Sequence, residues 1–292
     1  MAFPKPQYPL DWLTQLWNIA CGERINLKQD AWLLGPIGEI GGISDRVVDS
    51  IAAKEGLEVF RNPVDSGLVD DFEGFRFDAK DLNPRIQDFY RKTTHYDFDV
   101  WTQWQPVFGS FGYIVSKLFS QRVEQLNLPQ NPLDTAWGMK SEIINLRKPT
   151  GEMAHRVWFR RLKRTGEVVY SGIYSHCFLP SGEKCLKIIF PLPQGSATVI
   201  MKLQIDGKGN LTLESKGNES GDPGFYFIVE DREGILWKHY LPSFHERIHV
   251  YEDPEQTLRA DHSMNLWGLK AYDLHYKINQ RKNVRSASAS VE

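Results

Sequence analysis

The chain of 292 residues is long enough for one large domain or two domains of ordinary size. Hydrophobic residues make up 41% and charged residues 25% of it, which is the usual globular mixture and excludes a disordered or fibrous chain. The 35 basic and 37 acidic side chains leave a net charge of −2. Because binding to phosphate groups needs a positive surface, this balance argues against nucleic acid as a partner.

The first residues, MAFPKPQYPL, lack the basic start and apolar core of a signal peptide. No apolar run reaches the roughly 18 residues that a membrane helix requires, so we predict a cytoplasmic protein without a membrane span. The three cysteines are too few for a disulfide framework. Cys177 and Cys185 flank a predicted hairpin turn, and we expect them opposite each other on adjacent strands. Two reduced thiols are favoured over a disulfide or a redox pair.

Residues 1–132 are predicted to be mainly helical. Asp11 is a candidate N-cap for a helix over 11–24, in which apolar residues recur at helical spacing. Further helices are predicted after Ser44, after Pro84 and over 113–127. The glycine-rich stretch 35–42 is interpreted as a tight connection and not as a phosphate loop, because no Lys-Ser or Lys-Thr pair follows it.

From residue 133 to residue 278 the helical period gives way to short segments rich in β-branched and aromatic residues, separated by recurrent turn signals. This pattern predicts about nine to ten antiparallel strands, which must close or curl to protect their edges. The expected fold is α+β, with the N-terminal helices packed on a large antiparallel β-sheet or barrel of calycin-like or helix-grip style. The polar tail 279–292 is predicted to be disordered.

Two side chains are candidates for acid–base catalysis because they share a strand face with apolar residues. His262 alternates in this way with Ala260 and Met264; a core histidine bonded to the backbone is favoured over a ligand-binding or acid–base role. Glu142 shares a face with Ile144, where a buried carboxylate could act as a general acid or base. An ion pair of Glu142 with Lys140 or with an arginine on a neighbouring strand is an equal alternative.

The candidate ligand-binding residues are amphipathic or apolar. Tyr170, Tyr174 and His176 share one face of a strand and could line a cavity with polar tips, although an outer surface is slightly favoured. Trp101 and Trp104 form a dense aromatic cluster that either buries the junction between the two halves, which is favoured, or walls a pocket. Met264 lies on the same apolar face as His262 and completes the set.

No metal or cofactor is predicted. His245 and His249 are four residues apart, but the segment is typical of a strand, which would separate them by about 13 Å, too far for one ion. The chain contains neither an HExxH zinc motif nor a GxSxG nucleophile elbow, and neither Cys177 nor Cys185 lies in a recognisable nucleophile motif.

Several short stretches of the β-rich half carry a resemblance to known proteins. They include Gly138-Met139-Lys140-Ser141-Glu142, Tyr170-Ser171-Gly172-Ile173-Tyr174-Ser175, Gly221-Asp222-Pro223-Gly224 and Leu266-Trp267-Gly268. On these stretches the chain resembles uncharacterised bacterial proteins of the YndJ-like kind and related domains of unknown function. The resemblance is one of layout, so it implies no activity and no functional residues.

The function predicted from these patterns is an intracellular binding protein that holds an apolar small molecule, such as a lipid, an isoprenoid or a polyketide-like compound, in a β-barrel cavity. The first alternative is a cofactor-independent isomerase, cyclase or lyase that uses Glu142 or His262 as its acid–base group. The second alternative is a protein-interaction module that uses the Trp101 and Trp104 cluster.

Overall fold

The structure is a computed structural model that describes residue 3 and residues 9–39, 45–105, 138–166 and 168–281, without the side chains of Leu10, Asp45 and Tyr170. The helix predicted over 113–127 and most of the predicted tail lie outside the described residues. Within the described ranges the three predicted helices are confirmed. The helical elements are α1 (Pro9–Cys21), η1 (Ala31–Leu33), α2 (Asp45–Glu55), η2 (Ala79–Asp81), α3 (Pro84–Arg91) and η3 (Thr93–His95).

Each described strand pairing between named elements is antiparallel, as predicted. The strands are β1 (Glu23–Arg24), β2 (Glu58–Arg61), β3 (Tyr96–Trp104), β4 (Met139–Arg147), β5 (Met153–Leu162), β6 (Val168–Phe178), β7 (Lys184–Leu192), β8 (Gly195–Ile205), β9 (Leu211–Glu214), β10 (Gly224–Glu230), β11 (Leu236–Tyr240), β12 (Phe244–Glu252), β13 (Leu258–Leu266) and β14 (Leu269–Gln280). The fold is therefore mostly β with N-terminal helices, which confirms the predicted α+β barrel.

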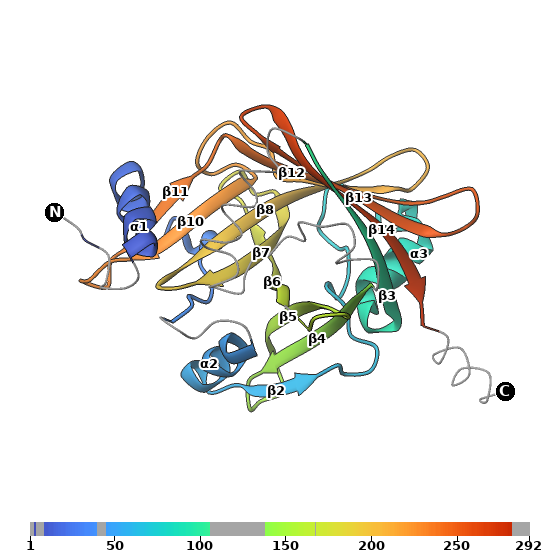
Figure 1. Cartoon of the computed structure of the whole chain (residues 1–292), viewed down its shortest axis with the longest axis horizontal. Helices are drawn as coiled ribbons and strands as arrows, with labels where there is room; N and C mark the ends of the chain where they lie inside the picture. The colour runs from blue at the N-terminus through green and yellow to red at the C-terminus, as the bar shows by residue number, and fades with distance from the viewer. Residues whose placement is uncertain (1–2, 4–8, 40–44, 106–137, 167, 282–292) are drawn as a thin grey trace.

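In the described chain, ten of these strands close into a barrel in the order β8-β7-β6-β5-β4-β3-β14-β13-β12-β9, and β9 pairs with β8 to complete the circle. β8 divides between two neighbours. Its residues Gly195 to Ile200 pair with β10, whereas Lys202 to Ile205 pair with β9. β10, β11 and β1 thus continue the same sheet as an arm that diverges from the barrel wall, on the side where α1 lies (Figure 1); this arm is called the diverging sheet.

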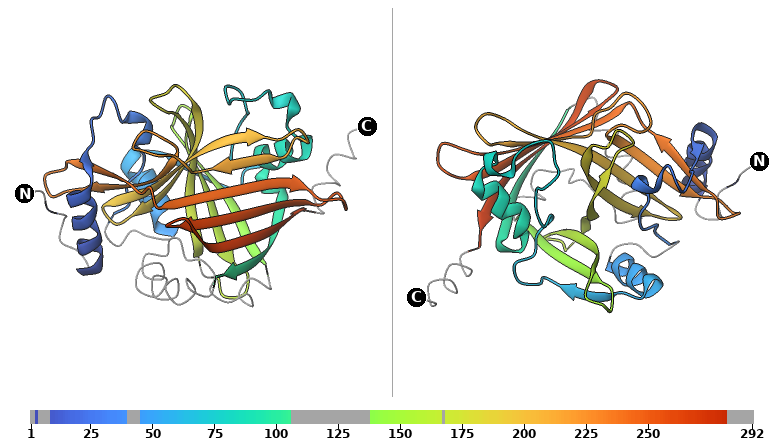
Figure 2. Two further views of the ribbon diagram at one scale, coloured as in Figure 1. Left: turned by 90° about the horizontal axis from the view of Figure 1, so that it is seen from above. Right: turned by 180° about the vertical axis from the view of Figure 1, so that it is seen from behind.

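The helices cover different parts of this barrel. α1 and α3 lie at opposite ends of the molecule (Figure 2). Around α3, aromatic rings of residues 72–90 pack into the barrel core: Phe72 lies 5.9 Å from Tyr90, and Phe89 lies 5.7 Å from Phe98 of β3 between ring centroids. α2 instead packs on the outer face, where Val48 and Ile51 join Ile144 of β4 in a second cluster.

Two barrel strands lie where the sequence did not predict strands. β3 comes from the region predicted to be mainly helical, and it pairs with both β14 and β4. Its buried residues alternate strictly, from Tyr96 through Phe98 and Val100, because the intervening aspartates face outward. β5 is rich in basic residues, and these conceal its apolar positions in the sequence. β3 thus contributes a segment from before residue 132 to the barrel wall.

Candidate functional site

The barrel contains a cavity of about 720 Å³. It is lined mainly by apolar side chains that point inward from alternate positions of the strands, such as Leu186, Ile188 and Phe190 on β7. The cavity reaches from Leu68 and Phe89 near α3 to Gln15 of α1. Few polar groups interrupt this lining, so each one that does is a candidate for recognition or catalysis.

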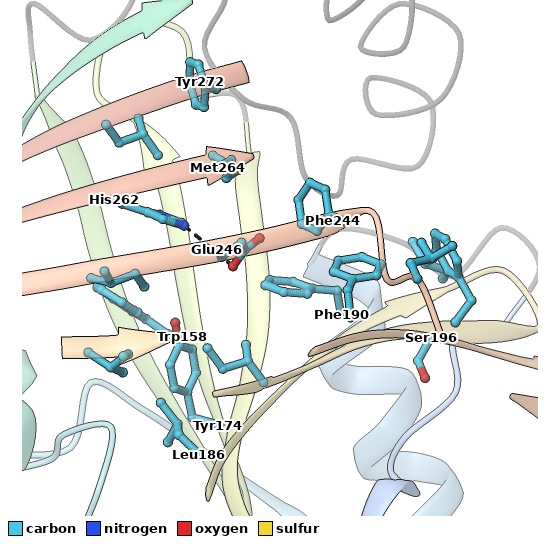
Figure 3. Close-up of a pocket in the computed structure, with 18 of the residues that line it drawn as sticks. Trp158, Tyr174, Leu186, Phe190, Ser196, Phe244, Glu246, His262, Met264 and Tyr272 are labelled. Atoms are coloured by element: carbon cyan, nitrogen blue, oxygen red, sulfur yellow. Dashed lines mark ion pairs between the residues drawn. The ribbon is translucent and has the colours of Figure 1, made fainter. Parts of the chain in front are cut away.

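Glu246 of β12 and His262 of β13 form a polar pair in the wall of this cavity (Figure 3). Their strands are neighbours, with Glu246 opposite Met264 and Ile248 opposite His262, so the two side chains lie diagonally on the inner face. His262 Nε2 is 3.6 Å from Glu246 Oε2, and the two side chains are only 15% and 14% exposed. His262 Nε2 is buried and has no hydrogen-bond partner among the described residues. Nε2 of His262 therefore faces the Glu246 carboxylate and not a backbone group.

Tyr174 of β6 faces the same region of the cavity. Figure 3 shows its ring directed toward Glu246. Burial is the main cause that raises the pKa of Tyr174; the Arg160 guanidinium lowers it, and Tyr276 and the Glu246 carboxylate raise it. Arg160, Tyr276 and Glu246 are thus close enough to Tyr174 to act on its ionisation, and the phenol of Tyr174 stays protonated at neutral pH.

Arg160 of β5 brings a positive charge to the cavity. Its guanidinium lies 4.0 Å above the ring of Trp158, and Nη1 donates a hydrogen bond of 3.4 Å to the hydroxyl of Tyr276. Trp158 is itself fixed, because its Nε1 donates to Ser141 Oγ at 2.6 Å. The cation–π contact and the hydrogen bonds hold the charged head in place. The cavity lining thus contains both a cation, Arg160, and an anion, Glu246.

Four of the predicted site residues line the cavity together: His262, Met264, Tyr174 and Trp104. Trp104 packs against Tyr272 with ring centroids 4.2 Å apart. The slight preference for an outer surface at Tyr174 is corrected, because its strand turns this face toward the cavity. For the side chain of Tyr170, on the same strand, the structure gives no description.

Three other predicted residues lie outside the cavity. Glu142 is on the outer face of β4, and its Oε1 lies 3.8 Å from Arg61 of β2, the neighbouring-strand arginine that the sequence left as an alternative. Trp101 is 51% exposed, since it alternates with Trp104 across β3. The two tryptophans therefore do not form one patch. His176 is exposed, and its ring lies 6.2 Å from the ring of Phe178.

Sequence reasoning missed Glu246 and Arg160. A signal for Glu246 exists: Phe244, Glu246, Ile248 and Val250 alternate along β12, with Glu246 as the polar exception. The strand predicted from the sequence began only at Ile248 and therefore left out Glu246. The signal for Arg160 was weaker. It shares a strand face with Trp158, two residues earlier, but other basic residues of β5 obscure this alternation.

α1 forms one border of the cavity. Gln15 Nε2 donates to the backbone oxygen of Pro193, and the rings of Trp17 and His239 meet edge to face at 4.6 Å. Both α1 residues also line the cavity. Gly22 lets the end of α1 approach β11 closely, since a Cβ atom there would lie 2.5 Å from the carbonyl oxygen of Lys238. α1 is thus attached to the diverging sheet and contacts the cavity at the same time.

The histidines considered for metal binding are engaged singly. His245 Nδ1 lies 3.4 Å from the carbonyl oxygen of Ser215, and His249 Nδ1 lies 3.1 Å from Thr212 Oγ1. In the part of the chain that the structure describes, no three His, Cys, Asp or Glu side chains are grouped so that they could hold a metal ion. None of the described helices is both long and apolar enough to cross a membrane.

Comparisons with protein-family models, with curated proteins and with solved structures found no match for this chain. The resemblance to YndJ-like proteins accordingly stays a prediction. The arrangement of side chains in the cavity therefore carries the functional argument by itself.

Proposed function

We propose that this protein binds an apolar small molecule, such as a lipid, an isoprenoid or a polyketide-like compound, inside its barrel as calycin-like proteins do. The observation that carries the proposal is the cavity of about 720 Å³ that extends from the interior of a closed antiparallel barrel to α1 and β10. Pockets for small ligands usually measure about 300–1,000 Å³ and combine an apolar lining with a few placed polar groups. The cavity matches this description in both respects.

Packing considerations support the same conclusion. Protein interiors are close-packed and contain few voids larger than a water molecule. Many large aromatic and aliphatic side chains around this barrel are fully buried, for example Phe98 and Ile143. The chain therefore has the means to fill its core, yet the inner positions of β13 include the small residue Ala260 beside the cavity. A bound small molecule explains why the barrel keeps a cavity of this size.

The test is to fill the cavity and measure binding. In Ala260→Phe a ring projects from the inner face into the space that a ligand would occupy, while Ala53→Phe places the same ring on the exposed surface of α2. The uncharged probe N-phenyl-1-naphthylamine is titrated against both variants and the original protein. We expect at least a tenfold loss of affinity for Ala260→Phe and none for Ala53→Phe. Equal affinity in all three proteins, with melting temperatures preserved, contradicts the proposal.

A second candidate function is a cofactor-independent isomerase, cyclase or lyase, and the pair of Glu246 and His262 is the observation that favours it. A histidine beside a carboxylate in an apolar cavity has the composition of an acid–base catalyst. In this candidate Glu246 has the acid–base role that the sequence predicted for Glu142. The test is deuterium uptake from D₂O into carbon positions of a ligand that co-purifies with the protein. Uptake that disappears in His262→Gln while the ligand stays bound supports an enzyme; the absence of uptake in the original protein excludes this candidate.

A further inference from the structure

The polar groups of the cavity restrict the chemistry of the ligand, an inference that rests on the proposed binding function. Glu246, His262 and Tyr174 present their polar atoms in one region of an otherwise apolar lining (Figure 3). His262 Nε2 is buried without a hydrogen-bond partner among the described residues, and the nearest Glu246 carboxylate oxygen, Oε2, lies 3.6 Å from it, beyond hydrogen-bond distance. Buried polar groups require partners, because an unsatisfied one costs the desolvation of that group. A ligand that satisfies them must therefore carry a polar group at this place.

The charge of that polar group follows from its neighbours. A carboxylate or phosphate would be held close to the carboxylate of Glu246, and like charges in a low-dielectric interior repel strongly. A cationic group would instead share the cavity with the guanidinium of Arg160, which lies over Trp158 and donates to Tyr276. Arg160 and Glu246 bring opposite charges to the lining, and Asp11 of α1 adds a second carboxylate at the border of the cavity. A fixed charge therefore opposes a ligand ion of either sign, and an uncharged ligand is favoured.

The hydrogen-bonding character follows from the same side chains. A carboxylate oxygen accepts hydrogen bonds, so a ligand group beside Glu246 binds it best by donating one. The phenol of Tyr174 and a protonated ring nitrogen of His262 are donors, so they need an acceptor. Ketones, ethers and esters accept but do not donate. A hydroxyl group does both through a single oxygen atom, and it is therefore the smallest group that can satisfy the carboxylate and a neighbouring donor together.

We infer that the ligand is an apolar alcohol, whose hydroxyl group binds between Glu246, His262 and Tyr174 and whose hydrocarbon body packs against Phe190, Leu186 and Met264. The hydroxyl donates its hydrogen to the carboxylate of Glu246 and accepts from His262 or Tyr174. The hydrocarbon body extends along the apolar lining, which supplies affinity in proportion to the buried area. Long-chain, isoprenoid and sterol alcohols share this chemistry.

The experiment uses the intact protein and three ligands of equal chain length: dodecanol, dodecanoate and methyl dodecanoate. Each competes with N-phenyl-1-naphthylamine at pH 7.5. We expect dodecanol to bind at least ten times more tightly than dodecanoate and at least three times more tightly than the ester. In Glu246→Gln the preference over dodecanoate should shrink to less than threefold, because the negative charge is gone. Glu142→Gln, the same substitution on the outer face of the barrel, should leave the preference unchanged.

The outcomes separate this inference from the proposed function. Probe binding that does not respond to Ala260→Phe overturns the function itself. If probe binding does respond, but dodecanoate or the ester binds as tightly as dodecanol, the cavity binds ligands and only the inference about the hydroxyl group fails. The comparison of the three ligands in the original protein decides this even if Glu246→Gln does not fold.

Discussion

His239 of β11 and Asn18 of α1 are joined by a contact of 2.9 Å between Nδ1 and Oδ1. Asn18 Nδ2 donates to the carbonyl oxygen of Thr14 at 2.9 Å, which fixes the amide so that its oxygen faces the imidazole. Nδ1 of His239 must then carry a hydrogen, and the neutral ring already satisfies the contact. Together with the ring contact to Trp17, this interaction attaches α1 to the diverging sheet.

The first prediction concerns the pH dependence of this attachment. Burial lowers the pKa of His239 in the folded protein. The pKa of His239 in the unfolded chain is about 6.5, so on acidification the imidazole takes up a proton in the unfolded chain before it does so in the folded protein. The folded protein therefore loses stability as the pH falls from about 6.5 to the lowered pKa of the folded state. Urea denaturation at a series of pH values should show a smaller loss on acidification in His239→Phe than in the original protein. The same loss in both would contradict this role of His239.

The second prediction uses the two tryptophans of β3. Trp104 lines the cavity, whereas Trp101 is 51% exposed on the other face of the same strand. Trp104→Ala should weaken binding of N-phenyl-1-naphthylamine several-fold, because it removes a large apolar surface from the lining. Trp101→Ala is the matched control and should change the dissociation constant by less than twofold. The opposite ranking would mean that the probe binds on the outer surface.

The third prediction concerns the thiols. Cys177 and Cys185 are directly opposite each other on β6 and β7 and both are free and buried, as the sequence indicated, whereas Cys21 is exposed. Burial raises the pKa of Cys177 to about 11 and that of Cys185 to about 12. Because the thiolate is the reactive form, only Cys21 should react rapidly with Ellman's reagent at pH 8. Cys21→Ser should abolish this rapid phase; a rapid phase that survives would show that the buried pair is accessible.

The fourth prediction concerns Lys187, which is buried on the outer face of β7. Its Nζ donates to the carbonyl oxygens of Trp32 and Leu34, at 3.0 and 2.7 Å, and so fixes the segment around η1 against the barrel. Lys187→Met should lower the free energy of unfolding by about 1–3 kcal/mol, because these partly buried carbonyl groups lose their charged donor. Lys54→Met, at an exposed position of α2, should change it by less than about 0.5 kcal/mol. Urea denaturation measures both.

The inner face of β13 could be predicted from the sequence. Alternation from Leu258 to Leu266 placed His262 and Met264 on the apolar side, and both line the cavity. The period of a strand is two, so side chains that share a face can be recognised without any tertiary information. The acid–base role of His262 stays a prediction, because location in the cavity does not establish chemistry.

Alternation could not show which face of a strand is the interior. Glu142 does share a face with Ile144 and Leu146, as predicted, but that face is apolar because α2 covers it from outside. Two apolar faces, one toward the cavity and one beneath a helix, give the same pattern in the sequence. The identity of Glu246 as the inward carboxylate depends instead on how β12 pairs with β13, and such pairing between strands is a property of the folded chain.

The division of β8 between its two neighbours, β10 and β9, also affects how a ligand exchanges. Only four residue pairs, from Lys202 with Glu214 to Ile205 with Leu211, join β8 to β9 and close the wall. Leu213 of this short seam lines the cavity, and the adjoining strand β12 carries Glu246. β3 and β4 are joined by a single pair, Phe98 with Met139, so the described barrel has a second short junction. Parting the four pairs of β8 and β9 opens the side of the barrel beside β12 while the long pairing of β12 with β13 stays intact, so we expect the lifetime of the complex to depend on the seam. A ligand bound to Glu246 restrains β12 and, through it, β9. The bound ligand therefore slows its own dissociation.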